Sequence, residues 1–427
     1  MQLEQIASLP GAGRLPKPRR WTEWAELQVE EFLSIPFVAE FVFRSVRLTE
    51  GSKQEEVADF LIFHRGAGIL IEQKCQDKDR TTQKEELWAR KNARAAWKQL
   101  RRALTRREGT PVWCVHPRRG RVEFREGLPP IQLGIVTVGV TQVVDLCAEA
   151  ERLPLDFRGV PISYLSVNDF LNLADQLRSV PDLLDYFAAR QLLPATDRLV
   201  IGDERTLLSF YLLNEGSFAR CTGREGARVA VAAQQDRLRE SIDRKRDSDQ
   251  DAYLLECVAD ALASRDPGLP VNPPPVFGLA YDPADRRTNY LEMQAALAGL
   301  RLRERAVLGR AFRGAMERVR DKARGFSFMA ARLDSKPEWV YVFGAARGVG
   351  RPELQQAIGN LMRGAMTFYE KRRCVAVVDR DGEGFEVGLS LPGFEPTLED
   401  RQLGTRFFGG LRVTSEPLPF IPEHRNA

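Results

Sequence analysis

Short apolar runs alternate with helical patterns in the first third of the chain, and this order predicts a mixed α/β domain. Apolar residues that recur every three or four positions indicate helices, and short, nearly continuous apolar runs indicate central strands. The expected elements are a helix at 21–34, a strand at 37–48, two strands joined by a tight turn within 57–77, an amphipathic helix at 84–108, and strands at 132–140 and 160–167.

The pattern changes after residue 167, where short helices that begin at Asn, Asp or Pro replace the strands. A proline-rich stretch at 263–283 is typical of a domain boundary. Beyond it, a long helix is expected from about 289 to 324, followed by two strands, a helix and a strand. We expect four segments: an N-terminal tail (1–20), an α/β domain (21–167), a helical region with a linker (168–265) and a C-terminal α/β domain (266–427).

The order helix, strand, strand, helix, strand occurs in both the first and the last of the larger segments. Two explanations stay open at this point. The C-terminal domain is either a degenerate internal duplication of the first domain or a chance recurrence of an order that is common in α+β proteins.

Composition places the chain among soluble globular proteins. It has 427 residues, of which 43% are hydrophobic and 29% charged, enough to bury a sizeable core. No apolar run approaches the ~18 residues that span a bilayer, and the N-terminus lacks the apolar centre of a secretory signal. We therefore expect a cytoplasmic protein that does not enter a membrane.

The cysteines and histidines exclude several classes of site. The six cysteines form no CxxC pair, which argues against a disulfide framework or a structural zinc site. The three histidines provide few residues from which a zinc hydrolase site or a Ser-His-Asp triad could be built. The net charge of +4 says little about partners by itself.

The predicted hairpin within 57–77 carries three charged residues inside its apolar runs. Side chains on a strand alternate faces, so Glu72 and Lys74 share one face. If Arg65 and Gly66 form the turn, Asp59 lies opposite Glu72, whereas a turn one residue later places it opposite Lys74. Either register puts all three charges on the same face.

Two carboxylates on one half-buried face repel each other unless they share a cation. A hard divalent cation prefers oxygen ligands and would make the pairing favourable. A neighbouring lysine can then help to deprotonate water and stabilise negative charge on a phosphate. The hairpin therefore suits metal-assisted hydrolysis of a phosphodiester.

The same residues resemble the core of the PD-(D/E)XK nucleases, in which a strand with an aspartate precedes a strand ending in Glu-x-Lys. The likeness is greatest to the nuclease-related (NERD-like) branch. Three stretches of this sequence carry it: "AELQVEEFL" on the N-terminal helix, "EVADFLI" on the first hairpin strand and "ILIEQK" on the second. The resemblance covers roughly residues 20–140 and implies a restriction-endonuclease-like core, with a central mixed sheet flanked by helices.

The resemblance also implies roles for individual residues. Asp59 and Glu72, with the main-chain carbonyl of Gln73, would bind Mg²⁺ or Mn²⁺, and Lys74 would be the catalytic lysine. Glu26 best matches the helix glutamate that reaches the metal in this family; two neighbouring glutamates match less well.

Gln99 stands where the family often has a glutamine on the helix after the Glu-x-Lys strand, and it would position water or a phosphate. A plainer interpretation exists for each position. The hairpin could be an edge strand with a surface Glu72–Lys74 pair, Gln99 an ordinary solvated residue, and Glu26 one of many glutamates on its helix.

The helix predicted at 84–108 carries a basic face opposite its alanine and leucine stripe. The residues of this face are Lys91, Arg94, Lys98, Arg101 and Arg102. Because acidic partners are scarce on this helix, the face suits a nucleic-acid backbone, although a solvated helix face is the common alternative.

The expected function is that of a Mg²⁺-dependent nuclease, with DNA the favoured substrate and a homodimer or a partner protein possible. By family analogy alone, such a protein acts in phage defence, restriction or repair. The alternative is a non-catalytic protein that binds nucleic acid or protein through a degenerate nuclease fold. In the C-terminal domain, Phe343, Gly344 and Ala345 stand where Glu, Gln and Lys would be by pattern.

Overall fold

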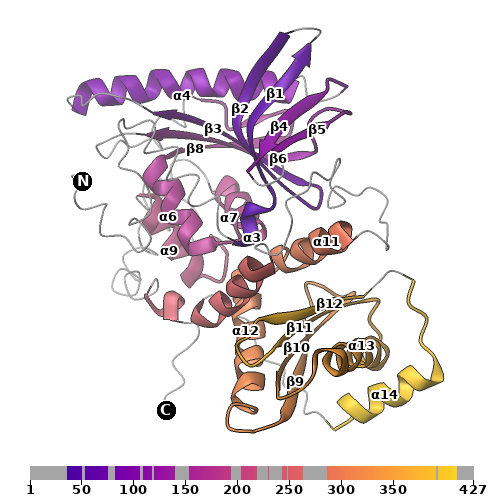
Figure 1. Cartoon of the computed structure of the whole chain (residues 1–427). Helices are drawn as coiled ribbons and strands as arrows, with labels where there is room; N and C mark the ends of the chain where they lie inside the picture. Colours follow the sequence, from indigo (N-terminus) through magenta and orange to yellow (C-terminus); the bar gives the residue numbers. More distant parts are fainter. Residues whose placement is uncertain are drawn as a thin grey trace. The chain divides into compact units, whose positions relative to one another are not determined.

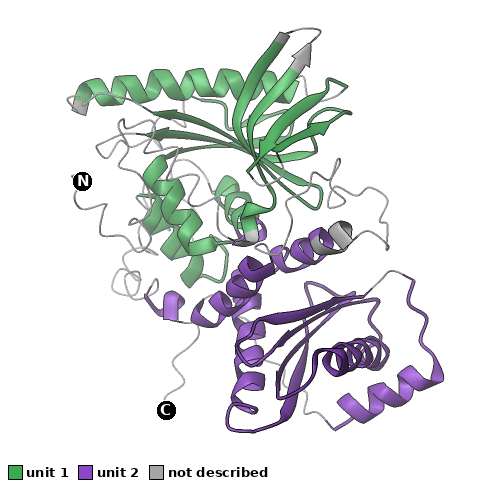
Figure 2. Cartoon of the chain, in the orientation of Figure 1, with its two compact units in different colours: residues 1–178, 183–239 green, residues 179–182, 240–427 purple. Residues whose placement is uncertain are grey.

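The computed structural model forms two compact units, coloured separately in Figure 2. The first comprises residues 1–178 and 183–239, and the second residues 179–182 and 240–427. Within them the structure describes residues 36–50, 53–75, 82–105, 109–117, 120–139, 153–193, 203–218, 229, 243–247, 249–262, 286–390 and 393–410. The mixed α/β class expected from the sequence is confirmed. The four expected segments stay a prediction, and the proline-rich boundary lies outside the described residues.

The described strands of the first unit form one mixed sheet of eight strands, in the order β5-β4-β1-β2-β3-β6-β8-β7 (Figure 1). Neighbours from β5 to β3 are antiparallel, and β3, β6 and β8 are parallel. The strands are β1 (Val42–Glu50), β2 (Lys53–His64), β3 (Ala67–Cys75), β4 (Val112–His116), β5 (Gly120–Phe124), β6 (Ile131–Gly139), β7 (Asp156–Phe157) and β8 (Val160–Ser166).

Helices cover both faces of this sheet, as Figure 1 shows. Helix α4 (Thr82–Thr105) contacts β2, β3 and β6, whereas α6 (Val167–Leu177) contacts β6, β8 and α9 (Glu204–Leu213). Two further helices of the region are α3 (Pro36–Ala39) and α7 (Val180–Leu192). The expected central sheet with flanking helices is therefore present.

Small side chains let α4 approach the sheet closely. Its buried stripe, as predicted, consists of Ala89, Ala93, Ala96, Leu100 and Ala103. On the facing strand β6, a side chain at Gly134 would meet Ile162 and Leu100. Because Gly134 pairs in parallel register with Leu70, α4 lies on the face to which Leu70 and the charged residues of β3 belong.

Two details of the first unit differ from the expectation. The strand expected at 37–48 begins only at Val42, because α3 occupies residues 36–39. The hairpin of β4 and β5 was not predicted. Its strands have five residues each, and the basic residues between them in the sequence interrupt the apolar pattern.

The second unit has its own four-stranded sheet, in the order β12-β11-β10-β9. Strands β10 and β11 are parallel, and each outer strand is antiparallel to its neighbour. The elements are α11 (Arg286–Ala298), α12 (Leu302–Glu317), β9 (Gly325–Arg332), β10 (Trp339–Arg347), α13 (Arg351–Phe368), β11 (Arg373–Asp379), β12 (Phe385–Leu389) and α14 (Leu398–Phe408).

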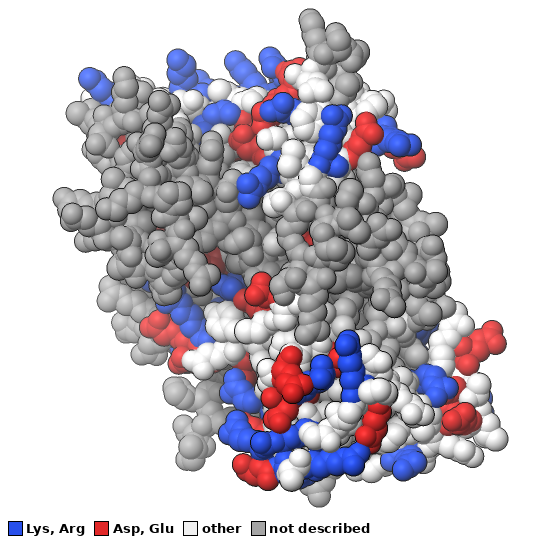
Figure 3. Space-filling model, in the orientation of Figure 1, with Lys and Arg blue, Asp and Glu red and all other residues white. Residues whose placement is uncertain are grey.

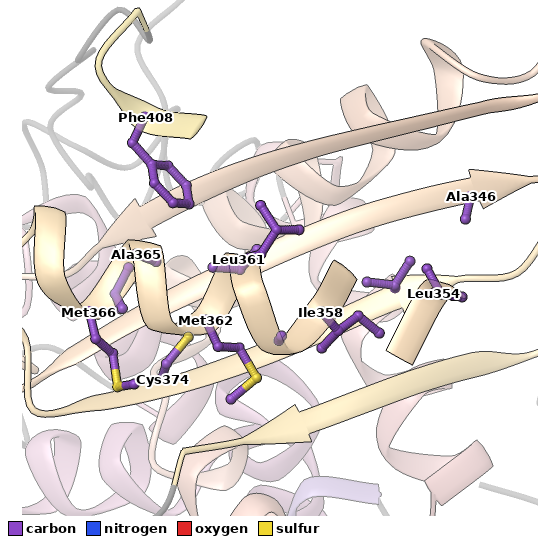
Figure 4. Close-up of a cluster of buried hydrophobic side chains, with 13 residues drawn as sticks. Ala346, Leu354, Ile358, Leu361, Met362, Ala365, Met366, Cys374 and Phe408 are labelled. Atoms are coloured by element: carbon purple, nitrogen blue, oxygen red, sulfur yellow. The ribbon is translucent and has the colours of Figure 1, made fainter. Parts of the chain in front are cut away.

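Alternation along β10 separates the two apolar layers of this unit. Val340 and Val342 face α13, in the core shown in Figure 4, where Leu361 is also buried. Phe343 points to the other side, where its ring lies 5.5 Å from that of Phe312 on α12. Helix α13 therefore covers one face of the sheet and α12 the other, and α14 packs on α13.

The long helix expected from 289 to 324 is wrong, because the chain breaks between α11 and α12. Gly299 lies in the break, where its conformational freedom disfavours a continuous helix. The Arg301 main-chain N–H then donates to Glu304 Oε2 at 2.8 Å and starts α12 anew.

Apart from β4 and β5, which lie between α4 and β6, the order of β2, β3, α4 and β6 recurs in β9, β10, α13 and β11: an antiparallel hairpin, a helix and a parallel strand. The facing, however, shifts the expected alignment by one residue. Glu72 faces its crossover helix, whereas Phe343 faces away from α13. The helix-facing positions of β10 are Val342, Gly344 and Ala346, which carry no ionisable group. Duplication itself stays a prediction.

None of the helices in the described part of the chain combines the length and the apolarity needed to cross a bilayer.

Replacing Leu361 with Ala tests the core of the second unit. Leu361 is 1% exposed, so the cavity should lower the stability of this unit by about 2–5 kcal/mol. Leu398→Ala is the matched control, because Leu398 is 71% exposed and its loss should change stability by less than about 0.5 kcal/mol. Hydrogen exchange of β10 and β11 peptides in urea measures both, and equal effects would contradict the assignment.

Candidate active site

The turn of the β2–β3 hairpin fixes which charges face each other. Arg65 and Gly66 have φ values of 47° and 82°, so both lie in the left-handed region that a two-residue turn of this kind requires. His64 pairs with Ala67, and the register runs on to Phe60 opposite Ile71. The first of the two predicted registers is therefore correct, and its next position sets Asp59 against Glu72.

The pairing of β2 with β3 stops at Phe60, although β3 continues to Cys75. Beyond that point β2 pairs with β1 alone. The β1–β2 register also shifts there, between the pairs Val46–Ala58 and Arg47–Glu56. Such an irregularity bends a strand and increases its twist, so β2 separates from β3 beside Asp59.

Asp59 accepts a hydrogen bond from a main-chain N–H of β3 that is no longer paired with β2. The N–H of Gln73 donates to Asp59 Oδ2 at 2.6 Å. A residue in a strand directs its N–H and C=O to the same neighbouring strand. The carbonyl of Gln73 is therefore directed to the edge of β3 on which Asp59 lies.

Glu72 is buried in the same place, with an exposed fraction of 1%. Lys74 Nζ donates to its Oε1, and the lysine side chain is 25% exposed. The other oxygen, Glu72 Oε2, is buried without a hydrogen-bond partner. A buried carboxylate oxygen in this state is costly, and an absent ligand is one explanation for it.

The pKa values of Asp59 and Glu72 show that charge on these two buried carboxyls is costly. Burial raises the pKa of Glu72 from 4.5 to about 8, and the charge of Asp59 adds to the rise while Lys74 opposes it. Burial also raises the pKa of Asp59, against the lowering by the N–H of Gln73 and by Lys74. Without a cation, the pair therefore holds a proton at neutral pH.

The donors present fit a cation that keeps several waters better than one enclosed entirely by protein ligands. Within the described residues, no group of three or more His, Cys, Asp and Glu side chains is arranged to hold a metal. Two carboxylates and a carbonyl remain, from Asp59, Glu72 and Gln73. Mg²⁺ is commonly bound through one or two carboxylates and keeps several waters, so this set suits Mg²⁺ or Mn²⁺ and not zinc.

The structure places the two remaining predicted catalytic residues differently. Gln99 is half-buried on α4, at the border of the stripe that packs on the sheet. It lies one turn from Arg102, which pairs with Glu55 on β2, so it occupies the β2 side of the helix. Glu26 and the helix predicted at 21–34 lie outside the described residues, and Glu26 stays a prediction.

The predicted basic face is exposed along α4, and Figure 3 shows Lys and Arg side chains along the edge where α4 lies in Figure 1. Arg102 Nη1 lies 3.1 Å from Glu55 Oε1. No carboxylate of the described residues pairs with the other four, Lys91, Arg94, Lys98 and Arg101. The positive charge of this face is thus largely uncompensated.

Two acidic residues of the first unit were missed by the sequence reasoning. Glu56 raises the pKa of both Asp59 and Glu72, so its charge reaches the pair. Its place in the charged run before Asp59 could have indicated it. Glu85 is fully buried in the first turn of α4, in line with the alanine stripe, which a longer helical projection would have shown.

Comparison with known proteins adds no relative: no protein-family model matches the chain, and neither a curated protein nor a solved structure is significantly similar to it.

Changing Glu72 to Gln should alter the pH dependence of stability measured in EDTA. In the wild type, the carboxyl of Glu72 retains a proton in the folded protein that it releases above pH 4.5 in the unfolded chain. The contribution of Glu72 to the free energy of unfolding is therefore fully present below 4.5 and is lost as pH rises toward about 8. The Gln variant cannot titrate, so its urea-unfolding free energy should fall less over this window. Parallel curves for the two proteins would contradict the assignment.

Proposed function

We propose that the chain is a nuclease dependent on Mg²⁺ or Mn²⁺ that hydrolyses phosphodiester bonds, with DNA the favoured substrate. One observation carries the proposal: Asp59, Glu72 and Lys74 meet where β2 leaves β3, and a buried oxygen of Glu72 has no partner. Repelling carboxylates beside a lysine are costly in a structural hairpin, but they suit a site for a cation and a phosphate.

Asp59 and Glu72, with the main-chain carbonyl of Gln73, would hold the cation. When bound, it supplies Lewis-acid polarisation of the phosphate and lowers the pKa of water. Both carboxylates would have to be ionised to hold the cation, so the proton that the pair otherwise retains would be released to solvent. The affinity for the cation should therefore rise with pH as Glu72 ionises.

Lys74 supplies the second charge that hydrolysis needs. Its Nζ, held by Glu72 Oε1, would stand beside the negative charge that develops as water attacks the phosphorus in line with the leaving oxygen. With Glu72 bound to a cation instead, the same ammonium would donate to a phosphate oxygen, and its charge would favour deprotonation of the attacking water. Gln99, on the β2 side of α4, would orient water or a phosphate oxygen.

The exposed cations of α4 would hold the substrate. Their residues recur on one face of a 24-residue helix of about 36 Å, so the backbone of a nucleic acid could follow them. Contacts of this kind bind phosphates whatever the base sequence.

A second candidate function follows from the incomplete donor set. At the proposed site only two carboxylates, those of Asp59 and Glu72, are counted as ligands. Among the described residues, no group of three or more His, Cys, Asp and Glu side chains suits a metal. If this set does not hold a cation, the fold serves as a non-catalytic binder of nucleic acid or protein.

Single substitutions at the carboxylate pair and the lysine should strongly slow cleavage. Glu72→Gln removes a cation ligand and Lys74→Ala a positive charge, so each should lower the rate by about 10²-fold or more. Cleavage of plasmid and labelled oligonucleotides with Mg²⁺, Mn²⁺ or EDTA provides the measurement. Glu399→Gln, at an exposed position of α14 in the second unit, is the matched carboxylate control and should keep the wild-type rate.

Each outcome of that assay has a distinct meaning. Cleavage that survives in both site variants places the activity elsewhere and refutes the proposed site. No cleavage under any condition, with binding of DNA retained, favours the non-catalytic alternative.

Removing positive charge from α4 should weaken DNA binding in EDTA. The salt dependence is the slope of log Kd against the logarithm of the salt concentration. In the double variant Lys98→Ala, Arg101→Ala this slope should fall by about 0.9 for each phosphate that the helix no longer neutralises. Arg102→Ala should have a smaller effect, because Glu55 already compensates its charge. Fluorescence anisotropy with a labelled duplex measures both, and equal slopes for the double variant and the wild type would contradict a role for this face.

A further inference from the structure

Away from α4, three neighbouring strands of the first unit bring an indole against two guanidinium groups. The ring of Trp113 on β4 lies 5.1 Å from Arg47 Cζ on β1 and 4.5 Å from Arg121 Cζ on β5. We call Arg47, Trp113 and Arg121 the arginine–tryptophan stack.

A guanidinium that lies over an aromatic ring is fixed in orientation, yet the N–H groups at its rim stay able to donate. The side chain then loses less entropy when it binds an oxyanion. The Nε1 atom of Trp113 is itself buried, so the indole does not offer its own N–H to a ligand. The role of the indole is therefore to hold the two guanidiniums in place.

The positive charge of the two arginines in the stack is only weakly neutralised by neighbouring carboxylates. Arg121 is exposed, and no carboxylate of the described residues pairs with it. Arg47 Nη2 lies 3.4 Å from Glu56 Oε2, but both side chains are more than one-third exposed, and an ion pair of this kind is weak. Val115, which pairs with Arg121 across β4 and β5, is 36% exposed and adds an apolar contact.

The stack and the proposed site belong to the same sheet but lie on opposite faces of it. Strand β1 pairs with β2, which carries Asp59. The partner of Arg47 is Glu56, whose charge reaches both Asp59 and Glu72. Glu55 on β2 pairs with Arg102 of α4. Its neighbour Glu56, and with it Arg47, therefore faces away from α4 and from Asp59. A nucleic acid would have to contact both faces of the sheet to reach the site and the stack together.

We propose that the arginine–tryptophan stack is a second contact for the backbone of a nucleic acid, with Arg121 donating its planar N–H fork to a phosphate. Planar forks match phosphate oxygens in pairs, and the apolar Val115 suits a sugar face beside it. The proposal rests on the nucleic-acid binding proposed above and not on cleavage.

The test compares two arginines of the same hairpin region. Arg121→Ala should weaken binding of labelled single-stranded and duplex DNA in EDTA by about fivefold or more, and lower the salt slope by about 0.9. Arg125→Ala makes the same charge change just beyond β5, at a side chain that is 85% exposed and pairs only loosely with Glu123. It should weaken binding by less than about twofold. Arg121→Lys keeps the charge but loses the fork, and should fall between them.

Equal losses for Arg121→Ala and Arg125→Ala would overturn the proposal, because net charge alone would then explain them. Unchanged binding in Arg121→Ala would overturn it as well. So would a wild-type protein that binds neither single-stranded nor duplex DNA. Thermal unfolding of each variant excludes loss of the fold. Cleavage is scored separately: weakened binding without any cleavage supports the stack and refutes the nuclease, whereas cleavage with unchanged binding in Arg121→Ala does the reverse.

Discussion

The repulsion between Asp59 and Glu72 is the constraint around which the first unit is arranged. The two carboxylates meet on a buried face, where charge is costly, and three partial compensations surround them: the N–H of Gln73, the ammonium of Lys74 and a retained proton. Each leaves something unsatisfied, and one oxygen of Glu72 has no partner. A divalent cation would resolve all of this at once, which is the physical basis of the nuclease proposal.

The separation of β2 from β3 makes that arrangement possible. If the ladder continued past Phe60, the main-chain groups of Gln73 would pair with β2 and could serve neither Asp59 nor a cation. The register shift near Val46 bends the ribbon of β1 and β2 away at this point. Arg47 and Glu56 lie beyond the same irregularity but face the other side of the sheet, so the carboxylate pair and the arginine–tryptophan stack occupy opposite faces of one sheet.

The second unit shows what the same order of elements becomes without the charges. Its parallel strand pair, hairpin and crossover helix repeat the first unit, but the helix-facing positions of β10 are Val342, Gly344 and Ala346. They serve an apolar core against α13, where no cation or proton is needed. A hairpin of this kind therefore packs without polar residues, and the charges of β2 and β3 call for an explanation beyond folding.

The sequence by itself determined the elements that depend on local periodicity: the hairpin, the stripe of α4 and the shared face of Asp59, Glu72 and Lys74. Alternation along a strand is local, so facing could be predicted although two registers stayed open. Tertiary structure decided what depends on residues far apart in the chain. Only the φ values of Arg65 and Gly66 chose the register, only the strand pairing showed where β2 leaves β3, and only the neighbouring strands brought Trp113 between β1 and β5.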